Sequence, residues 1–114
     1  MQSLLLESRF KRADALAQQE KFASAVRLVR QSMRSIRGPR VRERCLDQIA
    51  ELYVRWADSL AQAGRTSEAR RLLNSVRKMA RNDRLRDVSQ KRIAALQTVA
   101  GAATLPVAAL SSIR

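Results

Sequence analysis

Residues 53–79 constrain the fold of this chain most strongly, because they have the pattern of two amphipathic helices joined by a tight turn. Apolar residues recur three and four positions apart before the turn, at Tyr53, Trp56, Ala57, Leu60 and Ala61. A second stripe follows the turn, at Ala69, Leu72, Leu73, Val76 and Met79. Gly64 stands between the stripes, where the end of a helix often requires a positive φ angle, and the hydroxyl of Thr66 or Ser67 is expected to cap the next helix.

The hairpin predicted for residues 53–79 resembles a tetratricopeptide repeat, a pair of antiparallel helices that stacks with its neighbours into a solenoid. In this resemblance Tyr53 takes the aromatic opening position, Ala57 and Ala69 take the two small-residue positions, and Gly64 is the turn glycine. Four residues depart from the family's pattern: Trp56, Leu60, Val76 and Arg81. The resemblance implies stacked helical hairpins and does not imply a particular ligand.

Parts of the sequence recur at an offset of 44 residues. Residues 13–18 match residues 57–62, and Ala25 matches Ala69. Glu20 stands in the first copy where the second has its turn glycine, and a weaker match begins a third unit near Leu85. Tetratricopeptide repeats usually have a period of about 34 residues, so we expect lengthened helices or a related class of solenoid.

The expected architecture is an all-α solenoid domain over residues 1–100, with two hairpins at 2–36 and 40–81 and one further helix at 84–100. Gly38–Pro39 and Asn82–Asp83 are the expected breaks, with an N-cap at the second. The predicted helices cover residues 2–19, 22–36, 40–63, 67–81 and 84–100. The predicted core is mainly aliphatic and includes Leu5, Leu6, Phe10, Ala13, Leu16, Cys45, Ile49, Leu60, Leu85, Ile93, Leu96 and Val99.

Residues 101–114 form an apolar tail that contains Gly101 and Pro106, so a long continuous helix is not expected there. We expect Leu105, Val107 and Leu110 to dock on this domain or on a neighbour, and self-association is one consequence of leaving them uncovered.

The composition agrees with a single all-α domain. The chain has 114 residues with only three Gly and two Pro, which leaves few places for strands or long loops. Residues 1–6 are too short a stretch for a signal-peptide core and lack its charged start. No run approaches the roughly 20 apolar residues of a membrane helix. A cytoplasmic location is therefore the default expectation.

Candidate catalytic residues are few. The chain has no His, and its one Cys, Cys45, is expected in the core without a base to activate it. Glu43, Asp47 and Glu51 share one helical face, where we expect them to meet cations on the next helix. The sequence has no phosphate-cradling glycine loop and no metal-ligand spacing, so we predict a protein without catalysis, cofactor or metal.

The basic residues follow a more regular spacing along the chain than the candidate catalytic residues do. The net charge is +13, and 19 of the 23 basic residues are Arg. They recur at helical spacing in two ridges, which are expected to lie near each other as candidates for binding an anion or a partner: Arg27, Arg30, Arg34 and Arg37 in the first, and Arg70, Arg71, Arg77, Lys78 and Arg81 in the second.

Several interpretations of this charge stay open. The ridges could be the solvated faces of amphipathic helices, and the Arg bias could reflect a GC-rich genome. An anion-binding surface would attract either an acidic protein segment or a nucleic-acid backbone. All four aromatic residues, Phe10, Phe22, Tyr53 and Trp56, are predicted in the core, which leaves none for stacking on bases. We therefore predict a protein-interaction or assembly module, with a basic nucleoprotein subunit as the alternative and membrane-surface binding as a weaker third.

Overall fold

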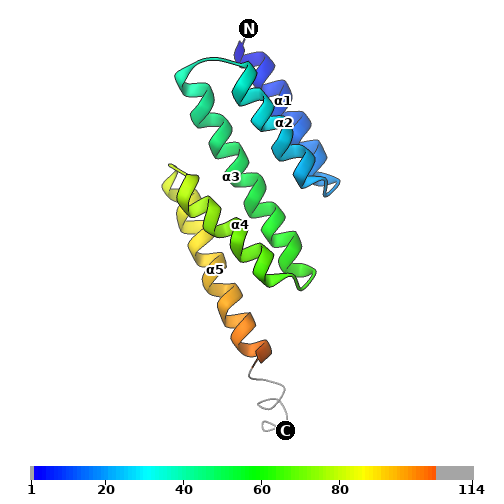
Figure 1. The fold of residues 1–114 in the computed structure, drawn as a ribbon, viewed down its shortest axis with the longest axis vertical. Coiled ribbons are helices and arrows are strands. Elements are labelled where there is room, and N and C mark those ends of the chain that lie inside the picture. The colour runs from blue at the N-terminus through cyan, green and yellow to red at the C-terminus, as the bar shows by residue number, and fades with distance from the viewer. Residues whose placement is uncertain (1, 105–114) are drawn as a thin grey trace.

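The computed structural model describes residues 2–104, with side chains described for residues 5–97, and within this range it is all-helical and has no strand (Figure 1). The all-α prediction is confirmed. The helix ends lie within two residues of those predicted, except that α5 runs four residues further. The five helices are α1 (Gln2–Gln18), α2 (Phe22–Ser35), α3 (Pro39–Gln62), α4 (Thr66–Met79) and α5 (Asp83–Thr104).

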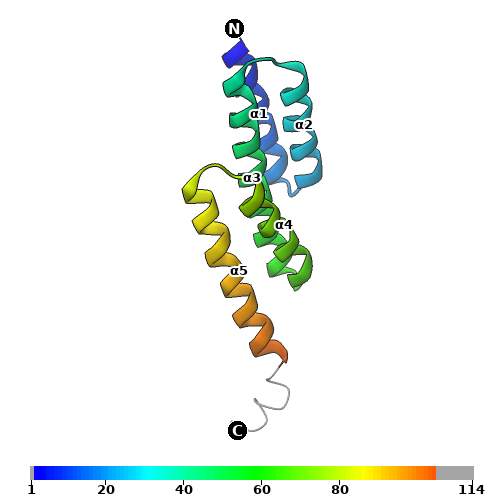
Figure 2. The same cartoon turned by 60° about the vertical axis from the view of Figure 1, so that its left-hand side comes forward.

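Helix α3 is the centre of the molecule, since it packs against each of the other four helices. Figures 1 and 2 show α1 and α2 together along the upper part of α3, and α4 and α5 along its lower part. Within the described residues, no Cα atom of α1 or α2 lies within 8 Å of a Cα atom of α4 or α5. The 24-residue length of α3 explains this arrangement, because it is long enough to support one pair of helices at each end.

The buried residues fall into two clusters that meet on α3. The first joins α1 and α2 to Cys45, Ile49 and Leu52, and the second joins α4 and α5 to Ala50 and Val54 among others. The apolar spacing predicts a single inward stripe on this helix, which leaves out the buried residues Ala50, Leu52 and Val54. A helix packed on two sides buries residues between the positions of one stripe. Leu5 was wrongly placed in the core, since 46% of its surface is exposed.

The two tight turns have nearly the same geometry. Glu20 has a φ of 61° and Gly64 has a φ of 82°, as predicted for the turn glycine. In each turn the next N–H bonds to a carbonyl five residues earlier: from Lys21 to Leu16 and from Arg65 to Leu60, both at 2.8 Å. A positive φ is strained for Glu and easy for Gly, so the first turn carries a backbone strain that the second avoids.

One predicted helix cap is wrong. Helix α4 begins at Thr66, which makes Arg65 the N-cap residue, and no side chain caps the helix. The Arg65 side chain can only donate, and it bonds to the Glu68 carboxylate at 2.7 and 3.1 Å. The other breaks behave as predicted: Pro39 starts α3 after Gly38, whose φ is 143°, and the Asn82 side chain accepts the N–H of Arg84 at 2.9 Å.

Several predictions concern residues that lie outside this description. The burial of Val99 falls beyond the described side chains, and the docking of Leu105, Val107 and Leu110 falls beyond residue 104.

Candidate functional site

Most of the acids on α1, α3 and α5 are paired with bases. Asp14 accepts from Gln48 at 3.0 Å and from Arg55 at 3.3 Å, and Asp58 accepts from Arg92 at 2.7 and 3.0 Å. The bond to Asp58 is also the main reason why the pKa of Arg92 is raised, although desolvation opposes it. These contacts join α1 to α3 and α3 to α5.

The acidic row of α3 meets cations, although not on the helix that follows it. Glu43 pairs with Arg81 at 3.2 Å, just after α4 ends, and Glu51 pairs with Arg84 at 2.6 Å, in the first turn of α5. Asp47 lies between these two acids, and its pKa is raised by desolvation first and then by the charges of Glu51 and Glu43.

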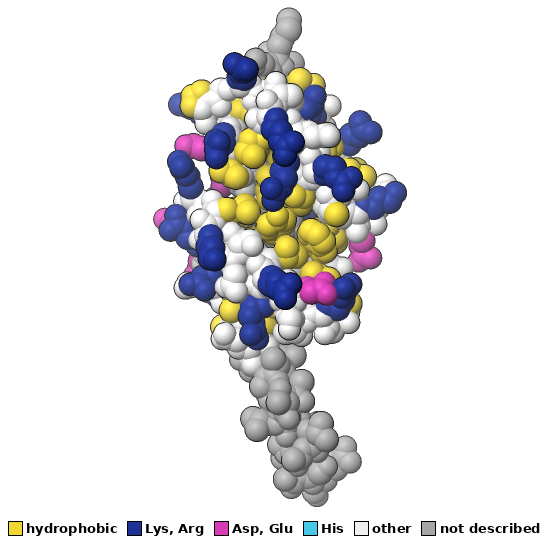
Figure 3. Space-filling model, viewed as in Figure 1, with side chains coloured by type: hydrophobic (Ala, Val, Ile, Leu, Met, Phe, Trp, Pro, Cys, Tyr) yellow, Lys and Arg dark blue, Asp and Glu magenta, His cyan; other side chains and the backbone are white. Residues whose placement is uncertain are grey.

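Helices α2 and α4 have a different balance of charge. Helix α2 contains no acidic residue, and the single acid of α4, Glu68, is bonded to Arg65. We use the name basic face for the exposed bases of these two helices: Arg27, Arg30 and Arg34 of α2, and Arg71, Arg77 and Lys78 of α4. Figure 3 shows this side of the molecule, where apolar surface lies between groups of Lys and Arg side chains and few acids are seen.

Three of the predicted ridge residues lie apart from the basic face. Arg81 lies beyond the end of α4 and is paired with Glu43. Arg37 lies beyond the end of α2 and lines a hollow of about 490 Å³ with Arg40 and Arg44. Arg70 is half-buried, and within the described structure its Nε is buried without a hydrogen-bond partner. The offset of 44 residues explains this, because Arg70 corresponds to the buried Val26.

A groove of about 270 Å³ lies between α2 and α3. We call it the α2–α3 groove. It is lined by Ala23, Val26, Arg27, Arg30, Tyr53 and Trp56. The Arg30 guanidinium donates to the Tyr53 hydroxyl at 2.8 Å, so this Arg is held beside an aromatic surface. The bond uses one of the five guanidinium N–H donors, and four are left for an anion.

This groove revises the prediction that all four aromatic residues lie in the core. Phe22 is buried, but Tyr53 and Trp56 are only partly buried and line the groove. The Trp56 ring stacks on Phe22 with centroids 6.1 Å apart and meets Tyr53 edge-on at 6.3 Å. Tyr53, Trp56 and Met79 pack against both buried clusters, so they lie at the junction between the two halves of the molecule.

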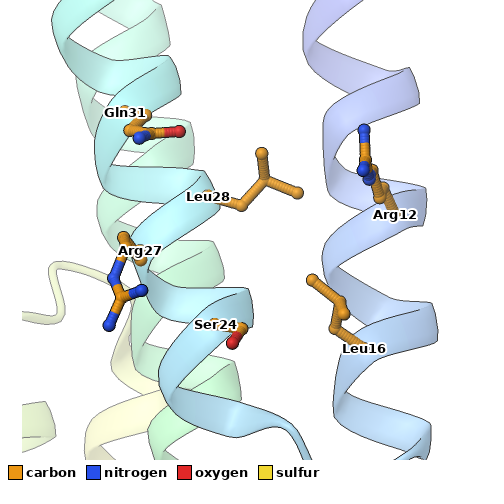
Figure 4. A pocket seen from close by; sticks show the side chains of 6 residues that line it. All are labelled: Arg12, Leu16, Ser24, Arg27, Leu28 and Gln31. Atoms are coloured by element: carbon orange, nitrogen blue, oxygen red, sulfur yellow. The ribbon is translucent and has the colours of Figure 1, made fainter.

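A second hollow, of about 300 Å³, lies on the other side of α2 (Figure 4). Leu16 of α1 and Leu28 of α2 point toward each other across it, while Arg12 and Arg27 stand on opposite helices. Arg27 lines this hollow as well as the α2–α3 groove, so it stands between the two. The second hollow lacks the aromatic floor and the fixed Arg of the groove.

The arrangement is suited to binding an anion that also has an apolar part. Among the described residues, no group of three or more Asp, Glu, Cys or His could hold a metal ion, and no helix is long and apolar enough to span a membrane. Cys45 is fully buried, as predicted, and this desolvation raises its pKa against the opposing effect of Arg44. Comparisons with protein-family models, curated proteins and solved structures found no match.

Proposed function

We propose that this protein is a non-catalytic interaction module, built as a short tetratricopeptide-like solenoid, which binds an anionic protein partner through its basic face. The repeat is supported by helix bounds that recur 44 residues apart: Phe22–Ser35 corresponds to Thr66–Met79, and the starts of α3 and α5 correspond as well. Buried positions correspond in the same way, including Ala25 with Ala69 and Cys45 with Ser89.

The segregation of charge is the observation that carries the proposed function. Most acids on α1, α3 and α5 are bonded to bases of those helices or of the α4–α5 connection, as with Asp14, Glu43, Glu51 and Asp58. The basic face has no such partners on α2, and the one acid of α4 is used by Arg65. Ordinary solvated helix faces carry mixed charges, whereas a one-sided excess favours association with an anionic surface.

A basic subunit of a nucleoprotein complex is the second candidate. The same face favours it, because arginines without acidic neighbours can neutralise phosphates and release their counterions. We rank it second because the groove is lined by only two aromatic rings, and one face of Trp56 is already stacked on Phe22.

Fluorescence anisotropy near physiological salt tests the proposal, with a labelled acidic peptide, a single-stranded oligonucleotide and a duplex as probes. We expect the peptide to bind and the oligonucleotides to bind more weakly. If nucleic acid is the partner, log affinity will fall linearly with log salt, and each Arg→Gln change on the basic face will reduce the slope by about one. Failure of every polyanion to bind more tightly than the millimolar range would exclude an anion-binding function.

A further inference from the structure

We infer that the α2–α3 groove receives an apolar anchor residue from an acidic amphipathic helix, an inference that rests on the proposed function and specifies its partner. The groove combines an apolar floor with two guanidinium groups at its edge. Its volume of about 270 Å³ is just below the range of about 300–1,000 Å³ that is usual for drug-sized ligands. It therefore suits one or two protruding side chains better than a whole small molecule.

The floor determines what the anchor must be. Val26 is 7% exposed, and the Trp56 ring is fixed by its stacking on the buried Phe22. Tyr53 is fixed at its hydroxyl by Arg30 and at its ring edge by Trp56. A rigid apolar floor loses little side-chain entropy when it is covered, so a Leu-like or aromatic anchor is favoured there.

The edge determines the charge of the partner. Arg27, Arg30 and Arg34 follow one another at spacings of three and four residues, which places them over about 10 Å of α2. A partner helix with carboxylates at the same spacing can meet all three while its apolar stripe faces the groove. Because α2 contains no acid, such a partner replaces no existing ion pair on this helix.

Tyr53 has a positioning role in this inference. Its hydroxyl holds the Arg30 guanidinium at the edge of the groove, so that less conformational freedom is lost when a carboxylate binds. Replacing Tyr53 with Phe would keep the ring and release the Arg, which separates positioning from packing.

The probe for this inference is a designed amphipathic peptide with a Leu stripe flanked by Glu at three- and four-residue spacing. A control peptide has the same residues in an order that destroys the stripe, and an oligonucleotide is the third probe. Trp56 is the only Trp of the chain, so its emission reports directly on occupancy of the groove. Labelled probes give the affinities by anisotropy.

We expect the striped peptide to bind and to shift the Trp56 emission to shorter wavelength, while the permuted peptide does neither as strongly. Arg30→Gln should weaken binding about tenfold, in line with the loss of a hydrogen bond to a charged group, and Tyr53→Phe should weaken it by roughly threefold because positioning alone is lost. Arg12→Gln, in the hollow on the other side of α2, is the matched control and should change affinity less than twofold. Thermal melts check that each variant stays folded.

Two results would overturn the inference. Equal binding of both peptides without a change in Trp56 emission would show that the basic face attracts anions without using the groove, and the proposed function would survive. A Trp56 response to the oligonucleotide and not to the peptide would assign the groove to nucleic acid instead.

Discussion

The Asp58 carboxylate accepts two hydrogen bonds from Arg92, and 44 residues earlier the Asp14 carboxylate accepts one from Gln48. In each pair the donor lies 34 residues after the acid, on the next helix but one. The same polar contact is therefore made twice, once between α1 and α3 and once between α3 and α5. Arg92 takes the place of Gln48 in the second copy, so a single hydrogen bond from a neutral amide is replaced by a bidentate ion pair.

The strength of the Asp58–Arg92 pair can be measured with a double-mutant cycle of Asp58→Asn and Arg92→Gln. Both side chains are more than 40% exposed, so we expect a coupling free energy of only about 0.5–1 kcal/mol. The corresponding cycle of Asp14→Asn and Gln48→Ala should give a smaller coupling, because Gln48 carries no charge. Urea denaturation provides the free energies. A larger coupling for the Asp14 pair would mean that the arginine adds nothing to the contact.

The two turns should respond in opposite ways to substitution. Gly64→Ala should lower the free energy of unfolding by about 1 kcal/mol, because a φ of 82° is strained for Ala. The added methyl meets nothing within 4 Å, so backbone strain is the whole of the expected effect. Glu20→Gly should raise it, because the strain at a φ of 61° is relieved and only a 3.3 Å bond from Ser59 is lost. Chemical denaturation of both variants is the measurement. Destabilisation by Glu20→Gly would show that the Ser59 contact outweighs the backbone strain.

Ala57 and Ala69 should not tolerate larger side chains. They are 1% and 0% exposed in the second buried cluster. Replacing either with Leu should overpack the contact between α3 and α4 and cost about 1–3 kcal/mol. The exposed Ala15 provides a matched Ala→Leu control on α1, where little change is expected. Unchanged thermal midpoints for Ala57→Leu and Ala69→Leu would contradict the close packing of these helices.

Asp47 makes the stability depend on pH in a predictable direction. Desolvation, Glu51 and Glu43 all raise its pKa in the folded state, so the folded protein binds this proton more tightly than the unfolded chain does. The contribution of Asp47 to stability is then greatest at low pH and is lost as pH rises through the raised pKa. Asp47→Asn should increase the thermal midpoint at pH 7, and the gain should vanish below about pH 4, near the ordinary pKa of Asp. A gain that is equal at both pH values would exclude ionisation as the cause.

The all-α class and the helix bounds could be predicted from the sequence because their signals are local. Apolar spacing, Gly38, Gly64 and Asn82 determine where helices run and end. The two-sided packing of α3 was missed, since a single stripe gives no sign that Ala50 and Val54 face a second cluster. The cap at Thr66 was also wrong, because a shift of one residue in the helix start moves the cap to Arg65.

The candidate site could be predicted only in part. The ridges were visible as spacing, but the pairing of Arg81 with Glu43 was not, since these two residues lie 38 positions apart. The bond between Arg30 and Tyr53 joins residues 23 apart, and no local pattern predicts it. The partial burial of Arg70 could have been predicted, because the offset of 44 residues pairs this Arg with the apolar Val26.

The most direct test of the proposed binding surface is an amide chemical-shift titration of the labelled protein with the striped acidic peptide. We predict that the largest changes will follow α2 from Ala23 to Arg34, together with Tyr53 and the indole N–H of Trp56. Residues of the paired charges, Asp14, Asp58 and Arg92, should change little. Changes centred on those three residues, with α2 and Trp56 unaffected, would place the partner away from the α2–α3 groove and contradict a functional basic face.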